Sequence, residues 1–202
     1  MLRLGLSGGS GSGKGYMCAM LKSMGFACLD TDNLVHKLYN EDKALIEKIK
    51  NEFGDEVVSK AGTIDRSVLR NIVFSDKNKL KTLNLIVHRH VDQYCVNWLE
   101  DQENSGKSAA FIDAPQLFEA KMEHRFDYII SVIAPLEERV QRIIKRDGIT
   151  KEAAEKRINN QMTNDEYKKR SHFIIHNGQT DNSLEDLIKI LRSIGLSDLT
   201  IE

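Results

Sequence analysis

The stretch "LSGGSGSGKGYM", Leu6–Met17, contains the pattern G-x-x-x-x-G-K from Gly8 to Lys14. It follows the apolar segment "LRLGL", Leu2–Leu6, which predicts a short strand. A glycine-rich loop between a strand and a helix binds anions through main-chain N–H groups and the positive end of the helix. We therefore predict a phosphate-binding loop for a nucleoside triphosphate, with Lys14 reaching the β- and γ-phosphates.

Two other interpretations of the glycines are weaker. The dinucleotide fingerprint G-x-G-x-x-G fails, because in the registers that start at Gly9 and Gly11 its third glycine would fall on Lys14 and on Tyr16. A flexible glycine-serine turn with a solvated lysine would not require the preceding strand and the following helix. The sequence context therefore favours a mononucleotide.

One position departs from the phosphate-loop pattern. Gly15 follows Lys14 where the pattern requires serine or threonine, and in phosphate-loop enzymes that hydroxyl ligates Mg²⁺. Two hypotheses remain open at this point: a working phosphate site that lacks one Mg²⁺ ligand, or a nucleotide-binding protein of the same fold that has lost catalysis.

The pattern around the loop predicts alternating strands and helices. A helix follows the loop and stops at Gly25, and "FACLD", Phe26–Asp30, predicts a second strand. Strand, helix and strand at this spacing form a βαβ unit, so we expect a parallel sheet. Further strands are expected to end at Asp113, near Ala134 and at "FIIHN", Phe173–Asn177.

The segment between the second and third strands differs in character. Residues 40–107 show helical periodicity and contain no convincing strand. We predict an α/β fold with a five-stranded parallel sheet and helices on both faces. Residues 40–107 form a helical insertion between its second and third strands.

Composition excludes several other classes of protein. The chain has 202 residues and a formal net charge of −1, which gives no electrostatic support for nucleic-acid or membrane-surface binding. No apolar run approaches the ~20 residues of a membrane span. Its three cysteines, Cys18, Cys28 and Cys95, lack C-x-x-C spacing and predict reduced thiols in a cytoplasmic protein, with Cys18 packed rather than reactive.

Motifs in a fixed order along nearly the whole chain resemble the bacterial dephospho-CoA kinases, a family of phosphate-loop kinases. They are "SGGSGSGKGY" at Ser7–Tyr16, Asp30-Thr31-Asp32, Asp65-Arg66 with Leu69 and Phe74-Ser75-Asp76, His88-Arg89, "DAPQLFE" at Asp113–Glu119, Arg146-Asp147-Gly148 with Arg157 and Gln161-Met162, and Ile175-His176-Asn177-Gly178. Gly15, Tyr16, Ser10, Arg89 and Gln116 depart from the family's usual residues.

The resemblance implies a phosphate-loop kinase fold with a nucleotide-binding core at residues 1–39 and 108–202, a helical CoA-substrate insertion at 40–107 and a lid at 147–170 within the core. It also implies that Mg-ATP phosphorylates the ribose 3′-hydroxyl of dephospho-CoA to give CoA. It implies catalytic roles for Lys14, Asp32 and Arg146. Implied ATP-binding residues are Gly9, Ser10, Gly11, Ser12, Gly13, Lys14, Gly15, Tyr16, Arg142 and Asn177. Implied substrate-binding residues are Asp32, Arg66, His88, Asp113 and Pro115.

Each of the charged candidates also has an ordinary structural explanation. Asp32 is the expected general base, but it could equally cap the helix that starts near Asn33. Asp113 is the expected metal-side carboxylate, acting through water, but a strand-terminal aspartate can also bond a loop backbone. Arg142 and Arg146 share a helix face, with Arg146 at the transferred phosphate. For Arg139 we expect a solvated position.

A nucleoside or shikimate-type kinase is a rival within the same fold class. The long helical insertion and "DAPQLFE", Asp113–Glu119, argue against it. His88 and His90 do not form a metal site on a helix, because residues two apart do not face each other.

Overall fold

The computed structural model describes residues 1–74 and 76–196. Ser75, within one of the family-like motifs, lies outside this range. The chain divides into two compact units, one formed by Met1–Leu29 with Asp101–Glu202 and the other by Asp30–Glu100.

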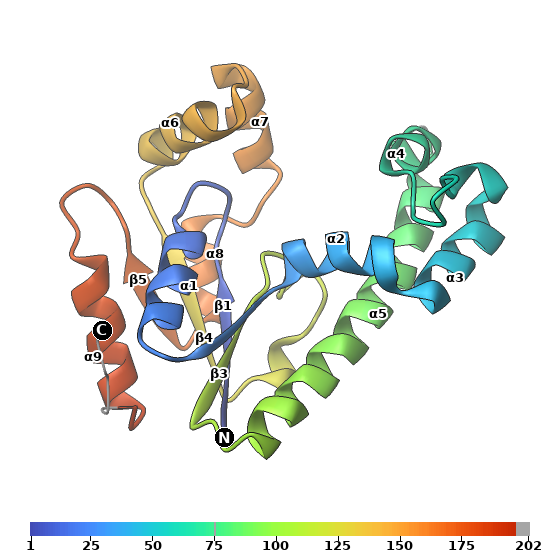
Figure 1. Ribbon diagram of the computed structural model, residues 1–202. Helices are drawn as coiled ribbons and strands as arrows, with labels where there is room; N and C mark the ends of the chain where they lie inside the picture. The colour runs from blue at the N-terminus through green and yellow to red at the C-terminus, as the bar shows by residue number, and fades with distance from the viewer. Residues whose placement is uncertain (75, 197–202) are drawn as a thin grey trace. The chain divides into compact units, whose positions relative to one another are not determined.

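A five-stranded sheet forms the centre of the first unit, in the order β2-β3-β1-β4-β5. Its strands are β1 (Leu2–Ser7), β2 (Ala27–Asp30), β3 (Ala109–Asp113), β4 (Tyr128–Ile133) and β5 (Phe173–His176). β1 is central and pairs in parallel with β3 and β4, and β4 pairs in parallel with β5 (Figure 1). The predicted parallel sheet is confirmed.

Helices cover both faces of this sheet because the strands are apolar on both sides. On one face, Leu4 and Leu6 of β1 join a buried cluster with Met17 of α1 (Lys14–Ser23) and Leu187 of α9 (Ser183–Ser193). On the other face, a Cβ on Gly5 would meet Leu117 at 2.6 Å. Glycine therefore admits close packing beneath β1.

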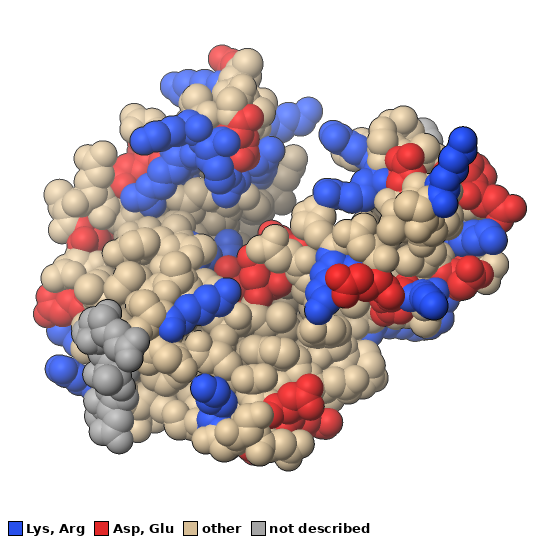
Figure 2. Space-filling view, viewed as in Figure 1, with Lys and Arg blue, Asp and Glu red and all other residues tan. Residues whose placement is uncertain are grey.

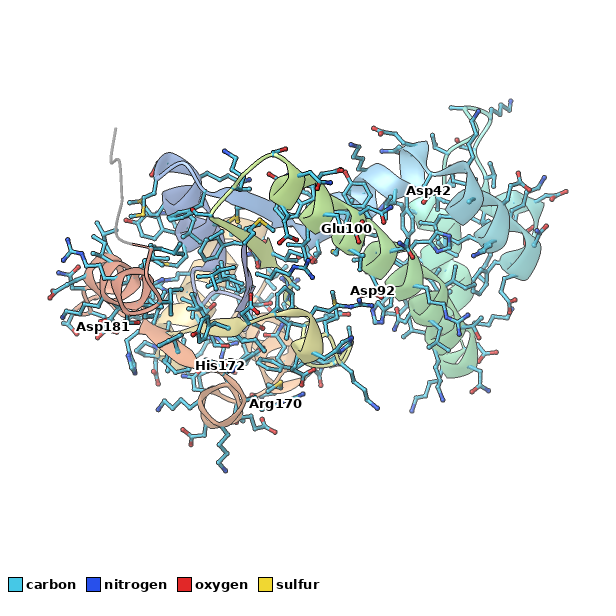
Figure 3. All side chains as sticks on the ribbon, turned by 90° about the horizontal axis from the view of Figure 1, so that it is seen from below. Asp42, Asp92, Glu100, Arg170, His172 and Asp181 are labelled. Carbon is cyan, nitrogen blue, oxygen red and sulfur yellow. A yellow bond between two sulfur atoms is a disulfide. The ribbon has the colours of Figure 1, made fainter. Side chains whose placement is uncertain are left out.

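The opposite face also holds α8 (Asn164–Arg170), whose buried Tyr167 lies 5.9 Å from the Phe118 ring. Arg170 at the end of α8 stacks over the same Phe118 ring at 4.4 Å. His172, beside Arg170 in Figure 3, accepts a hydrogen bond from the Ile129 N–H at 3.0 Å. These contacts attach the α8–β5 junction to β4.

Two further helices, α6 (Leu136–Asp147) and α7 (Lys151–Asn159), pack on each other through Val140, Ile143, Ala154 and Ile158. α7 is followed by the short helix α8, which directly precedes β5. Thr163 and Glu166 form a capping box at the start of α8, where they exchange hydrogen bonds. Lysine and arginine side chains gather over α6 and α7 (Figure 2).

The second unit is helical. It contains α2 (Thr31–Glu41), α3 (Lys43–Phe53), the 3-10 turn η1 (Asp55–Val57), α4 (Arg66–Phe74) and most of α5 (Lys77–Asn104). It begins at Asp30, earlier than the boundary at residue 40 that the sequence suggested. The reason is that α2 packs with this unit, and its Tyr39 carbonyl accepts a hydrogen bond from the Ile64 N–H at 3.0 Å.

The prediction of three reduced thiols is wrong for two of them. Cys18 of α1 and Cys28 of β2 form a disulfide, with their Cα atoms 6.4 Å apart. The turn at Gly25 carries the chain back along α1, which brings the two positions within bonding reach. Cys18 is 5% exposed, as expected of a packed residue, and Cys95 is a buried thiol. Within the described residues, no helix combines the length and the apolarity needed to cross a membrane.

Candidate active site

The loop between β1 and α1 has the backbone geometry of an anion cradle. Gly11 and Gly13 adopt φ values of +76° and +101°. Residues with a Cβ rarely adopt such positive φ values. α1 begins at Lys14, and the Gly13 carbonyl accepts the N–H groups of Tyr16 and Met17 at 3.0 and 3.2 Å. The helix N-terminus is therefore directed at the loop, which favours bound phosphate.

Side chains from outside the loop hold three consecutive loop carbonyl oxygens. Arg139 Nε donates to Ser10 at 2.9 Å, Arg142 Nη1 donates to Gly11 at 3.2 Å, and Asn177 Nδ2 donates to Ser12 at 2.7 Å. Arg142 and Asn177, both predicted to bind ATP, thus lie at the loop and bond its backbone.

The predicted solvated position of Arg139 is wrong. Its side chain is only 4% exposed, and burial lowers the pKa of its guanidinium. Arginine remains charged even so, because its ordinary pKa lies so far above neutrality. Arg139 lies one turn before the buried Ile143 on α6, on the inward face of the helix. That spacing was the available sequence signal, but arginine at such a position is ordinarily read as a surface residue.

The segment after β5 is ordered around Asn177. Arg142 Nη2 donates to the Asn177 carbonyl at 2.8 Å and pairs with Glu138 at 2.9 Å. The Gly178 N–H donates to Asp181 Oδ2 at 2.7 Å, in the turn that precedes α9 (Figure 3). These bonds position the Asn177 amide against the phosphate-binding loop.

Arg146, the predicted phosphate contact, is engaged in an ion pair. Its Nε donates to Asp147 Oδ1 at 2.7 Å, and Arg157 of α7 pairs with the other oxygen of the same carboxylate. These hydrogen bonds, that of Arg146 first, lower the pKa of Asp147 to about 2. The Arg146 side chain is 61% exposed, so it belongs to the accessible surface of α6.

The two aspartates that follow β2 have different positions. Asp30 is the N-cap of α2, and its side chain accepts the N–H groups of Asp32 and Asn33 at 2.9 and 3.0 Å. Asp32 lies in the first turn of that helix. The alternative in which Asp32 caps the helix is therefore wrong, because Asp30 performs that function.

Asp113 ends β3 in register with Leu6 of β1 and is 7% exposed. The next N–H, that of Ala114, donates to the Leu6 carbonyl at 3.0 Å. This pairing places the Asp113 carboxylate beside the start of the phosphate-binding loop. Pro115 follows it in the same unit.

Two buried hydroxyls have no hydrogen-bond partner among the described residues: that of Ser7, the last residue of β1, and that of Ser12 in the loop. Sequence reasoning singled out Ser12 but not Ser7. A Cβ on Gly15 would meet nothing within 4 Å, so the position of the missing hydroxyl is open. In the described part of the chain, no three acidic, histidine or cysteine side chains are arranged to hold a metal ion by themselves.

The helical unit has a cavity of its own, about 390 Å³ in volume. It is lined by Tyr39, Arg66, Ser67, Leu69, Arg70, Val73 and Leu83. Burial raises the pKa of the Tyr39 hydroxyl, an effect that the Arg66 charge partly opposes. A cavity lined by two arginines and by apolar side chains suits a ligand that carries an anionic group on a less polar chain. Asp32 and His88 belong to the same unit.

Comparisons with known proteins identify the family of this chain. The family model for dephospho-CoA kinase matches residues 2–182. A dephospho-CoA kinase from Fusobacterium nucleatum is 37% identical, over 92% of this chain and 93% of its own.

Two solved structures are similar over 98% of both chains. The Thermus thermophilus protein TT1252 has a TM-score of 0.79 at 36% identity, and the dephospho-CoA kinase from Campylobacter jejuni has a TM-score of 0.72 at 25% identity. Because the family model covers residues 2–182 and the Fusobacterium nucleatum enzyme is 37% identical over most of both chains, this chain belongs to the dephospho-CoA kinase family.

Proposed function

We propose that the chain transfers the γ-phosphoryl group of ATP to the ribose 3′-hydroxyl of dephospho-CoA, giving CoA and ADP. The observation that carries this proposal is the phosphate-binding loop before α1, in a chain that matches the family over residues 2–182. The oxygen of the acceptor hydroxyl bonds to phosphorus, the bond to the β,γ-bridging oxygen breaks, and the hydroxyl proton leaves to a base.

Charge stabilisation supplies most of the catalysis in such a transfer. Lys14 and loop N–H groups such as those of Gly11 and Gly13 hold the triphosphate, with Arg142 and Asn177 supporting the loop. Arg146 exchanges its pairing with Asp147 for the transferred phosphoryl group. Its exposure on α6 supports this, because an exposed ion pair contributes little and is readily exchanged.

Asp32 accepts the proton of the 3′-hydroxyl. Support comes from Asp30, which already caps α2 and so leaves no capping role to explain the neighbouring carboxylate. General-base assistance of this kind contributes about 10²–10⁴-fold to the rate. Arg66 and His88 act on the substrate side together with Asp32, while Asp113 and Pro115 act from the end of β3.

Mg²⁺ fits the residues at the loop, though not as a cage of protein ligands. It usually keeps several waters and binds the phosphates of its nucleotide. The buried Asp113 carboxylate suits a water-mediated contact, and the orphaned Ser7 and Ser12 hydroxyls offer polar atoms in the same region. When bound, the ion would neutralise phosphate charge. Gly15 removes one direct ligand.

Product identification tests the proposal. The protein is incubated with Mg-ATP and dephospho-CoA, adenosine or shikimate, and products are identified by mass spectrometry. We expect CoA from dephospho-CoA and no phosphorylation of the other two or of CoA itself. A phosphorylated nucleoside or shikimate would contradict the assignment. ATP binding without any product would favour the catalytically impaired alternative. As an ATP-dependent enzyme, it is expected to work in the cytoplasm.

A further inference from the structure

One residue of the phosphate-binding loop is tied to the turn between α7 and α8 by a reciprocal pair of hydrogen bonds. The Ser10 N–H donates to Gln161 Oε1 at 2.9 Å, and Gln161 Nε2 donates to Ser10 Oγ at 3.0 Å. Arg139 completes the group, donating from Nη2 to Gln161 Oε1 at 3.2 Å and from Nε to the Ser10 carbonyl at 2.9 Å. Ser10, Gln161 and Arg139 thus form one closed network, called the Ser10 clasp below.

The clasp fixes the direction of a peptide group. In a planar trans peptide the C=O of one residue and the N–H of the next point in opposite directions. Arg139 holds the Ser10 carbonyl on the side of α6, so the Gly11 N–H points the other way. Asn177 does the same for the Ser12 carbonyl and hence for the Gly13 N–H. Anion binding by such a loop depends on its N–H groups sharing one direction.

The network is built for rigidity. Arg139 is 4% exposed, and Ser10 and Gln161 are half-buried. Hydrogen bonds from a charged donor in such surroundings contribute more than neutral, solvated ones, and an unmade one leaves a buried polar group unsatisfied. The hydrogen bond from Arg139 to the Ser10 carbonyl is therefore costly to break.

We propose that Arg139 is a positioning residue for ATP, seated by Gln161, which orients the Ser10–Gly11 peptide so that the Gly11 N–H faces the phosphates. Arg139 contacts the loop backbone rather than the nucleotide. It therefore affects ATP affinity and leaves dephospho-CoA affinity unchanged. The proposal rests on ATP as the phosphoryl donor.

A substitution at Gly9 would test the proposal without changing Arg139 or Gln161. A Cβ at this position would overlap Arg139 Nη2 and lie 3.2 Å from Gln161 Oε1. The backbone at Gly9 does not have a positive φ, so alanine is compatible with its conformation. The Gly9→Ala methyl group would thus act on the clasp itself, by displacing the Arg139 guanidinium.

The first test compares Arg139→Met with Lys145→Met, an exposed cation on the same helix. ATP affinity is measured by isothermal titration calorimetry without acceptor, together with KM for each substrate. We expect Arg139→Met to weaken ATP binding about 10- to 100-fold, with KM for dephospho-CoA and the Lys145→Met values unchanged. Unchanged ATP affinity in Arg139→Met, or a lowered Tm as its sole effect, would overturn the proposal.

A mutant cycle separates the clasp from general damage to the loop. Gly9→Ala should weaken ATP binding about tenfold or more in the parent. In an Arg139→Ala background the methyl group meets no guanidinium, so the further loss should be under about threefold. Fully additive losses would refute the proposal. Should the Arg139 variants not fold, Gln161→Met provides the same readout, with weakened ATP binding expected and unchanged binding contradicting it.

These measurements remain informative if the acceptor is misassigned. ATP binding by the parent protein without acceptor tests the loop and the clasp alone. Product formation from dephospho-CoA tests the proposed reaction alone.

Discussion

At the scale of single residues, Gly15 defines what is unusual about the site. Among the described residues, a Cβ built there meets no atom of another segment within 4 Å, so Gly15→Ser fits without displacing other parts of the site. We expect the serine variant to need less Mg²⁺ for half-maximal activity and to turn over faster, because a direct ligand replaces a water. The measurement is a Mg²⁺ titration of dephospho-CoA-dependent ADP release.

Gly15→Ala is the matched control, since either substitution also favours the first turn of α1, by up to about 1 kcal/mol for alanine. A gain shared equally by alanine and serine would mean that helix propensity, not the hydroxyl, was responsible. A parent that already saturates at low Mg²⁺, with no gain from serine, would show the hydroxyl to be dispensable.

Substitutions at Asp32 and Asp30 should separate an effect on catalysis from an effect on stability. Because Asp30 caps α2, Asp32→Asn should leave Tm nearly unchanged and lower kcat about 10²–10⁴-fold. Asp30→Ala is the opposite case and should cost about 1 kcal/mol of stability through the lost cap. Steady-state kinetics with thermal unfolding of both variants checks this, and near-parental turnover in Asp32→Asn would contradict the general-base role.

Elements were more predictable from the sequence than their contacts. The strand, loop and helix at the N-terminus follow from periodicity and glycine placement, and the capping box of Thr163 and Glu166 follows from local bonding. The burial of Arg139 depends on α6 packing against the loop, and the Cys18–Cys28 bond depends on how α1 lies beside β2. The spacing of Arg139 from Ile143 indicates an inward helix face, but neither that spacing nor the separation of the two cysteines shows which segment packs against these residues.

The ion pair between Asp147 of α6 and Arg157 of α7 should make stability depend on pH. Hydrogen bonds from Arg146 and Arg157 lower the pKa of Asp147 from 3.8 to about 2. A lowered carboxyl pKa stabilises the fold above the unfolded value and loses that contribution as pH falls toward about 2. We expect an NMR titration of the Asp147 carboxyl carbon to have its midpoint near 2. A midpoint near 3.8 would show that the ion pairs do not form.

The disulfide between α1 and β2 closes a loop of 10 residues in sequence separation. A cross-link of that length should stabilise the protein by about 2–3 kcal/mol, mainly by restricting the unfolded chain. Adding dithiothreitol should therefore lower the Tm of the parent and leave the Tm of Cys28→Ser unaffected. Cys95→Ser should keep the parental response, because Cys95 is outside the bond. An unchanged parental Tm on reduction would contradict the stabilising role.

At the scale of the whole molecule, the chain is divided into two units with different chemistry. One has a loop that presents N–H groups and Lys14, and the other has a cavity with Arg66 and Arg70 at its wall. The position of the helical insertion was predictable, since it interrupts the strand pattern. The start of that unit at Asp30 was not, because α2 follows β2 directly and joins the insertion only through packing.

This division predicts that the binding of ATP and the binding of dephospho-CoA can be weakened separately by substitutions in different units. Arg66→Met removes a cation from the cavity wall but retains an apolar side chain, so KM for dephospho-CoA should rise about tenfold, the scale of one charge-assisted hydrogen bond to phosphate. KM for ATP should not change. Lys14→Ala should do the reverse, raising KM for ATP and lowering kcat about 10²-fold or more. Lys48→Met, at an exposed position of α3 outside the cavity, should match the parent. If Arg66→Met raised both KM values equally, or ATP alone, the helical unit would not be the acceptor site.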